Sequence, residues 1–564
     1  MTAKPRDRTR LARSGLAILA LLPACTGGIE SGNAYPTGND EQVATSGTST
    51  AGAGGSGGAA TTGNGAAATT MGASSGGGSS SNGGSSASGG AVVVGEFTRL
   101  TRAEYRATVV QALGVTPDVN LLPEDGRVEH FTSNHEVTPD PVHPYLLASE
   151  ELAALVVPES LPACDPEDAA ACVGETYAAV LEALFRRELV AADTATFGAV
   201  LEAVVAGGGA ADDATRAMLA AALLSPDFIY RASPSAVDRD PADASNVARR
   251  VAERLSFVLW DAPPDAELKQ SLAGSDELAD VLVAETARVT RDARAVPVLA
   301  RFFGQWLDVD TDLRLEDEDF ESSPEYLELL AFVEAAVADE MPVREFVGGT
   351  QGFAHRDNLE LYDVGEGEGS GDVVSVTFAD DSSRRGLLGH ELFAGSTRHP
   401  DHSRREIFRG LLVRNALLCD EIPPPDPELV ALAGEVEDRT TDGRCRNCHL
   451  RLDPIGRAFA DLDPDHEGTV PEAEVIGHDE VEGTYANAGL LLEAIAGSRA
   501  FAECFSRQWL AFFFEQRLSS IDAGWVTSLA DRVQGGASLG ELVEHTVGDL
   551  YIRSLTFVPW CEGS

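Results

Sequence analysis

The stretch from Gln42 to Gly95 contains no charged residue and consists mainly of Gly, Ser, Ala and Thr. A segment of this composition cannot bury enough apolar surface to offset its chain entropy, so it cannot form a core. It therefore separates a short N-terminal part from a long C-terminal part that holds most of the foldable sequence. As a flexible coil it would reach roughly 40 Å, which indicates a tether.

The residues before this tether have the pattern of an export signal. Basic residues up to Arg13 precede an apolar stretch, Leu16 to Leu22, that is too short for a bilayer, which needs about 20 residues. The stretch ends in Leu-Pro-Ala-Cys and resembles a bacterial lipobox, in which the cysteine, here Cys25, is acylated. Thr26 follows where Asp would favour the inner membrane. We expect an extracytoplasmic protein anchored at the outer membrane by acyl chains; an ordinary signal peptide with an incidental cysteine is the alternative.

The charge of the chain limits its partners. It has 42 basic and 90 acidic residues, for a formal net charge of −48. Nucleic acid is bound through Lys and Arg side chains that neutralise phosphates, so this balance argues against nucleic acid as a partner.

Helical patterns fill the sequence after the tether. Thr101 is placed as the N-cap of a first helix, with Glu104 as its capping-box partner. Similar apolar spacings predict helices over 177–189, 212–224, 246–260, 276–289, 326–340, 405–418, 489–497 and 501–514. We therefore expect a mainly α protein with several helical domains. Its predicted parts are a signal peptide with lipobox (1–25), a disordered linker (26–95), an N-terminal helical domain (96–240), a central helical domain (241–380) and a C-terminal domain (381–564).

The C-terminal domain contains the string Cys445-Arg446-Asn447-Cys448-His449. In this CxxCH spacing, two thiols can reach the two vinyl groups of a haem while the adjacent imidazole coordinates the iron. The pattern predicts one covalent c-type haem on Cys445 and Cys448, with His449 as an axial ligand. Three other interpretations remain: a structural CxxC disulfide, a zinc site, which lacks a nearby second ligand pair, and a thioredoxin-like redox pair.

The sequence after this string resembles a known family. Leu452-Asp453-Pro454-Ile455-Gly456 and Asp461-Leu462-Asp463 are similar to a block in secreted proteins, mostly of planctomycetes and myxobacteria, that combine tandem domains of unknown function with a planctomycete-type cytochrome c segment. Further blocks resemble the family in the same order: Arg99 to Tyr105, Phe185 to Arg187, Leu224 to Arg231, Arg254 to Trp260 with Pro263 to Asp265, Gln305 to Leu307, Arg385 to Gly389 and Pro423 to Pro425. The resemblance implies this architecture and a C-terminal cytochrome c-like segment, and it names no substrate.

The sequence does not identify the second axial ligand of the iron. The chain has four Met residues, and none follows His449, so we expect either a second histidine, for which His466 is the first choice, or a vacant distal side. The alternatives are His399, His402, His478, His545 and Met341. A weaker hypothesis is Ca²⁺, because Asp461, Asp463, Asp465 and Glu472 occupy positions 1, 3, 5 and 12 of an EF-hand-like loop, although His466 stands where the turn glycine is expected.

Five cysteines remain after Cys25 and the haem pair. Cys164 and Cys172 are close in sequence and are expected to form a disulfide in an oxidising compartment. The other three allow three pairings. We choose Cys419 with Cys504, because these residues flank the haem segment, which leaves Cys561 free.

Two functions from different classes follow. The first is a membrane-tethered, c-type cytochrome-like protein that transfers electrons to an unknown redox protein or has another haem-dependent redox role. The second is a non-redox cell-surface scaffold or binding lipoprotein with a structural CxxC disulfide. Whether the protein is an enzyme stays open; a hydrolase has little support, because the sequence has neither a GxSxG nor an HExxH motif.

Overall fold

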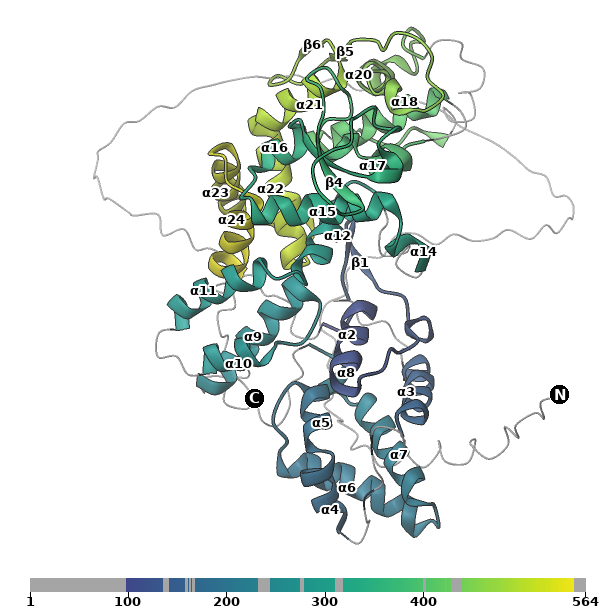
Figure 1. Cartoon of the computed structure of the whole chain (residues 1–564), viewed down its shortest axis with the longest axis vertical. Coiled ribbons are helices and arrows are strands. Elements are labelled where there is room, and N and C mark those ends of the chain that lie inside the picture. Colours follow the sequence, from purple (N-terminus) through teal and green to yellow (C-terminus); the bar gives the residue numbers. More distant parts are fainter. Residues whose placement is uncertain are drawn as a thin grey trace, which may run out of the picture. The chain divides into compact units, whose positions relative to one another are not determined.

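The computed structural model describes residues 98–134, 142–157, 161, 164, 168–231, 244–273, 278–309, 318–398, 402–420, 422–427 and 439–551. Helices dominate these residues, and the strands are short (Figure 1). The mainly α fold class is therefore confirmed. The expected signal peptide and linker, with Cys25, lie outside the described residues.

The first region ends near Tyr230. Its elements are α2 (Arg102–Leu113), η2 (Val119–Leu121), β1 (Arg127–Val128), β2 (Phe131–Thr132), α3 (Val142–Val156), α4 (Ala169–Ala171), η4 (Cys172–Thr176), α5 (Ala178–Phe185), α6 (Ala191–Ala206), α7 (Ala211–Leu223) and α8 (Pro226–Ile229). The capping box of α2 is confirmed: the amide of Glu104 donates to Thr101 Oγ1 at 3.2 Å, and the amide of Thr101 donates to Glu104 Oε2 at 2.8 Å.

The second region carries one β-hairpin among its helices. Its elements are α9 (Ala244–Trp260), α10 (Ala266–Ala273), α11 (Leu278–Thr290), α12 (Ala295–Trp306), α14 (Glu318–Glu321), α15 (Pro324–Ala338), α16 (Val343–Gly348), β3 (Gln351–His355), η6 (Arg356–Asn358) and β4 (Val373–Thr377). Strands β3 and β4 pair antiparallel, with His355 opposite Val373. The hairpin packs on α15.

The third region contains the CxxCH string. Its elements are η7 (Leu387–Gly389), α17 (Glu391–Ser396), α18 (His402–Leu412), η8 (Val413–Leu417), α20 (Arg446–Arg457), η10 (Ala460–Leu462), β5 (Ala473–Val475), β6 (Gly483–Tyr485), α21 (Ala488–Gly497), α22 (Arg499–Phe514), η11 (Leu518–Ser520), α23 (Ala523–Gln534), α24 (Leu539–Val543) and η12 (Glu544–Tyr551). Strands β5 and β6 form a short antiparallel pair beside α20.

Every predicted helix is present, and the bounds differ by a few residues. One such difference is at α5, which was predicted to continue to residue 189 and ends at Phe185. Arg186 adopts a left-handed backbone with φ of 58°. Its buried guanidinium forms an ion pair with Glu253 at 2.6 Å and donates to the carbonyl oxygen of Phe228. These contacts to α9 and α8 stabilise the chain at Arg186 more than a further turn of α5 would.

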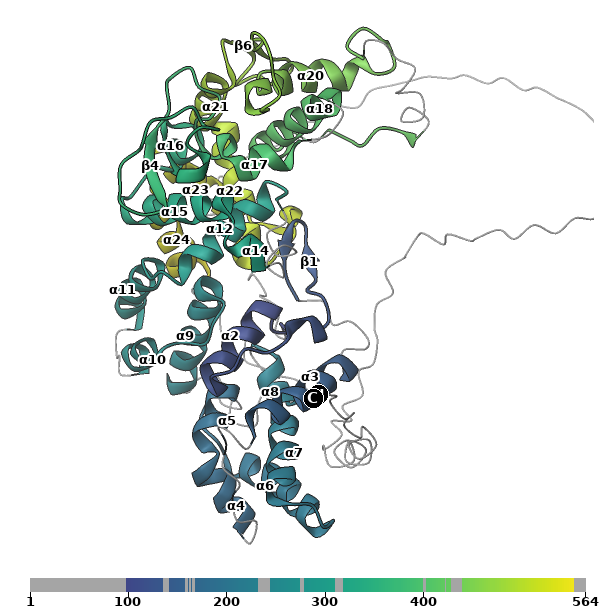
Figure 2. The same cartoon turned by 45° about the vertical axis from the view of Figure 1, so that its right-hand side comes forward.

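The main apolar core draws on residues from Phe131 to Val547. Helix α22 supplies much of it: Phe302 of α12 lies against Phe505 and Trp509, with ring centroids 5.9 and 4.9 Å apart. Figure 2 shows α22 next to α12 from a second direction. At the end of α22, Glu515 forms an ion pair with Arg231 and accepts from the Ser133 hydroxyl at 3.1 Å. Among the helices of the described residues, none combines the length and the apolar character that a membrane span requires.

Candidate functional site

The CxxCH string lies at the start of α20. Cys445 is the N-cap residue, and Cys448 and His449 belong to the first turn of the helix. The turn before the helix is fixed by Asp442, whose carbonyl oxygen accepts from the amide of Cys445 at 3.1 Å. Hydrogen bonds from the side chain and backbone of Arg444 lower the pKa of Asp442 to about 2. The start of α20 is therefore well defined.

The two thiols of the string are free. Cys445 and Cys448 are both partly exposed and form no disulfide. Residues three apart lie on the same side of a helix, so both sulfur atoms belong to one face at the beginning of α20. Attachment of a haem through two thioethers needs free, accessible thiols in this relationship. The cysteines of this chain meet that requirement.

His449 is held by a buried carboxylate one helical turn away. Its Nδ1 atom lies 2.9 Å from Oδ1 of Asp453, whose side chain is 7% exposed. A carboxylate can only accept, so Nδ1 carries the proton and donates. Nε2 then has a free lone pair, which is the form of imidazole that binds iron. The residues present thus fit a c-type haem: two free thiols and one oriented imidazole.

Helix α18 crosses α20 at two glycines. A Cβ atom on Gly410 of α18 would lie 2.2 Å from the carbonyl oxygen of Leu452, and one on Gly456 of α20 would lie 1.8 Å from the carbonyl oxygen of Glu406. Only glycine allows this approach, so the two backbones touch at both points. The two helices lie side by side in both views (Figures 1 and 2). This contact supports the helix that carries His449.

A charged cluster joins η8 to the N-terminal half of α20. The guanidinium of Arg414 is fully buried, forms an ion pair with Asp420 at 2.6 Å and donates from Nε to the carbonyl oxygen of Arg451 at 3.1 Å. Arg451 also pairs with Asp420, at 2.6 Å. The Arg451 and Arg414 hydrogen bonds lower the pKa of Asp420 against the effect of burial, so this carboxylate is held ionised.

Two disulfides are present in the described residues. Cys419, beside this cluster, is bonded to Cys504 of α22, and Cys164 is bonded to Cys172. These are the two pairs that we named from the sequence. The Cys419–Cys504 bond attaches the end of η8 to the core helix α22. Cys561, like Cys25, lies outside the described residues.

His466 and His449 belong to different ends of α20. The loop that carries His466 is fixed by Asp463, which forms an ion pair with Arg409 at 2.7 Å. Arg409 also donates to the carbonyl oxygen of Phe459, just beyond the C-terminal end of α20, whereas His449 lies in its first turn. About eight residues of helix, a rise of roughly 12 Å, separate the two ends. This arrangement gives no support to His466 as the second axial ligand.

The calcium hypothesis also lacks support. Asp463 and Asp465, which would be ligands, instead form ion pairs with Arg405 at 3.3 and 2.9 Å. Across the described residues, no group of three or more His, Cys, Asp or Glu side chains could hold a metal ion. Met341, another alternative ligand, packs against the main apolar core, and His399 lies outside the described residues.

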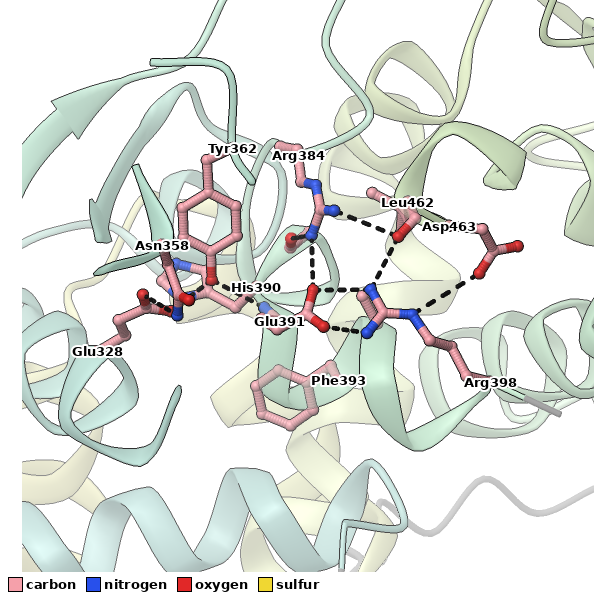
Figure 3. Close-up of polar contacts among 12 residues, drawn as sticks. Glu328, Asn358, Tyr362, Arg384, His390, Glu391, Phe393, Arg398, Leu462 and Asp463 are labelled. Atoms are coloured by element: carbon pink, nitrogen blue, oxygen red, sulfur yellow. Dashed lines mark hydrogen bonds and ion pairs between the residues drawn. The ribbon is translucent and has the colours of Figure 1, made fainter. Parts of the chain in front are cut away.

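Sequence reasoning missed a buried polar network next to this segment (Figure 3). Glu391 of α17 accepts from Arg384 at 3.1 Å and from Arg398 at 2.8 Å. Both arginines also donate to the carbonyl oxygen of Leu462, at 3.2 and 2.9 Å. Arg398 further lies 3.8 Å from Asp463. The network therefore ties α17 to the loop after α20.

The network continues to a buried carboxylate on α15. Tyr362 accepts from the amide of Glu391 at 2.9 Å and donates to Glu328, which is 0% exposed. Glu328 also accepts from Asn358 Nδ2 at 2.9 Å. Burial raises the pKa of Glu328 to about 7. The sequence signal was weak, because α15 also carries Glu325 and Glu334, and nothing in the pattern marks Glu328 as the buried one.

A histidine completes this end of the network. The ring of His390 is fully buried, stacks on Phe332 with centroids 5.0 Å apart, and has Nδ1 3.9 Å from Glu328 Oε2. Neither ring nitrogen has a hydrogen-bond partner in the described residues. Burial lowers the pKa of His390 to about 3. Figure 3 shows His390 next to Tyr362, with Glu391 following it along the chain.

Three family models match the chain in sequence order. PSD3, a protein of unknown function (DUF1587), matches residues 98–158; PSD4, a protein of unknown function (DUF1592), matches residues 248–364; and PSCyt3, a protein of unknown function (DUF1588), matches residues 384–470. Each match lies within one of the three predicted helical domains, and the PSCyt3 match includes Cys445 to Asp453. Comparison with curated proteins gave no match, and neither did comparison with solved structures.

The fold and these matches define a class: mainly helical proteins of planctomycete type, made of tandem domains of unknown function. The chain carries matches to DUF1587, DUF1592 and DUF1588 in this order, and the last of these domains has a cytochrome-like name. These matches agree with the family that its sequence blocks resemble. Its division into three domains at residues 241 and 381 stays a prediction.

Proposed function

We propose that this protein is an exported c-type cytochrome-like protein with one covalent haem. Cys445 and Cys448 would hold the haem through thioethers, and Nε2 of His449 would ligate the iron. The observation that carries the proposal is the geometry at the start of α20: two free thiols on one helix face, and a histidine whose Nδ1 atom is bound to Asp453 at 2.9 Å. The cytochrome-like name of the matching domain is consistent with it.

A haem bound here supplies one-electron redox chemistry. The residues of the chain hold and orient it. The crossing of α18 and α20 fixes the helix, Asp453 fixes the His449 ring, and the cluster around Arg414 fixes the neighbouring backbone. Because these supports are buried and the thiols are partly exposed, the function favoured is electron exchange with another redox protein at the exposed edge of this segment.

The test is production of the full chain in a host with cytochrome c maturation. The unmodified protein, Cys445→Ala/Cys448→Ala and the control Cys164→Ala/Cys172→Ala are denatured, separated from free haem and measured as pyridine haemochromes. We expect haem in the unmodified chain and in the control, and none in the Cys445→Ala/Cys448→Ala variant. A haem-free unmodified chain from a competent host would favour the scaffold function instead.

We also propose that acylation of Cys25 anchors the protein at the outer membrane. The support is the sequence pattern before the tether, since Cys25 lies outside the described residues. Cys25→Ser should move the protein from the membrane fraction to the soluble fraction, while haem content stays unchanged. Retention in the membrane pellet would contradict the anchor without affecting the haem proposal.

A further inference from the structure

We propose that Asp453 is a positioning residue that lowers the reduction potential of the haem by giving His449 anionic character. The proposal rests on the proposed function, because it needs His449 as an axial ligand. It goes further in assigning the site a low potential and in naming the residue that sets it.

The environment of Asp453 supports this role. Its side chain is 7% exposed, and its neighbours Leu452, Pro454 and Ile455 are buried. Among the described residues, His449 is the one hydrogen-bond partner of this carboxylate, and no arginine or lysine forms an ion pair with it. A buried carboxylate without a cation is costly, so its charge acts strongly on the one group that it touches.

Asp463 provides an internal comparison. It is also buried on this segment, yet it forms ion pairs with Arg409 at 2.7 Å and with Arg405 at 3.3 Å. Its charge is therefore balanced by cations, whereas the charge of Asp453 is directed at the His449 ring. A second carboxylate, Glu406 of α18, lies close enough to interact with Asp453: burial raises the pKa of Glu406, Arg457 lowers it, and the Asp453 charge raises it.

The physical consequence follows from the hydrogen bond. A carboxylate that accepts from Nδ1 increases the electron density on Nε2 and makes the ring a stronger ligand. A stronger donor stabilises ferric iron more than ferrous iron, because ferric iron carries one more positive charge. The reduction potential should therefore be lower than with a ring that donates to a neutral acceptor.

The experiment compares the midpoint potential of the holoprotein with that of Asp453→Asn, whose amide oxygen can still accept from Nδ1 but carries no charge. We expect Asp453→Asn to raise the potential, so that the ferric to ferrous ratio at a fixed potential falls at least tenfold, which is about 59 mV. Asp453→Glu should return the potential toward the original value. Glu406→Gln, which removes a nearby charge without a contact to His449, is the matched control and should cause a smaller rise.

An unchanged potential in Asp453→Asn with full haem content would overturn the inference and leave the proposed function standing. An unmodified chain without haem would overturn both. Resonance Raman spectroscopy of the unmodified ferrous protein gives a second reading that needs no variant. We expect an iron–histidine stretching frequency above that of ferrous haem with a neutral imidazole, and a frequency equal to that reference would also overturn the inference.

Discussion

Gly456 of α20 lies directly against the backbone of Glu406 in α18: a Cβ atom at this glycine would be 1.8 Å from the Glu406 carbonyl oxygen. The atom in the way belongs to the backbone of a packed helix, which cannot rotate aside as a side chain could. Gly456→Ala should therefore push the helices apart and destabilise the protein by about 3 kcal/mol, at the upper end of overpacking costs.

The measurement is urea unfolding followed by circular dichroism. Gly443→Ala, in the same segment, is the control, because a Cβ there meets nothing within 4 Å. We expect near-unchanged stability for the control. Equal stability of Gly456→Ala and the unmodified protein would show that the two helices do not pack as described.

The buried pair of Glu328 and His390 predicts a specific pH dependence. Glu328 has its pKa raised from 4.5 to about 7, so the folded state keeps a proton that the unfolded state releases. Its contribution to stability is full below pH 4.5 and is lost as the pH rises to 7, by about 3 kcal/mol in total. For His390, lowered from 6.5 to about 3, the contribution is full above pH 6.5 and is lost as the pH falls to 3.

Glu328→Gln isolates the first of these effects. The stability of the unmodified protein relative to this variant should be highest below pH 4.5 and should decrease up to pH 7. Glu334→Gln, which changes an exposed carboxylate on the same helix, should show no such trend. The free energy of unfolding of all three proteins is measured between pH 4 and pH 8, roughly the window set by these pKa values. A difference between the unmodified protein and Glu328→Gln that does not vary with pH would contradict the assignment.

The position of the His466 loop predicts whether carbon monoxide can bind to the ferrous protein. Because this loop is attached beyond the C-terminal end of α20 through Asp463 and Arg409, His466→Ala should leave carbon monoxide binding to the ferrous protein unchanged. We expect the unmodified ferrous protein to bind carbon monoxide, as an open distal side requires. A protein that resists carbon monoxide until His466 is replaced would instead establish bis-histidine ligation.

Helices with regular apolar spacing and clear caps could be predicted from the sequence. The Thr101–Glu104 capping box and the predicted pattern over 246–260, which the structure places at Ala244–Trp260, are examples. Helix α20 was not predicted, because Pro454 and Gly456 both oppose a helix interior. The helix nevertheless forms with Gly456 inside it. Only glycine fits at this position, because the backbone of α18 touches α20 there. Strands of two to five residues carry too few positions for an alternating pattern.

The candidate site was predicted in part. The CxxCH spacing identified Cys445, Cys448 and His449, because this chemistry is local in sequence. The role of Asp453 was missed, although its spacing of four residues from His449 would place both on one helix face once α20 was known. Glu328 and His390 come together only through the packing of α15 against α17, and no local pattern reports that contact.

The most direct test of the central claim uses the arginine between the two cysteines. Trypsin cleaves after Arg444, Arg446 and Arg451, which separates Cys445-Arg446 from the peptide Asn447 to Arg451. A haem bound through two thioethers would keep these peptides together after reduction, since reductants cleave disulfides and not thioethers. Mass spectrometry of the reduced digest should find both peptides joined with the mass of one haem. Two separate, unmodified peptides from a haem-competent host would contradict the account.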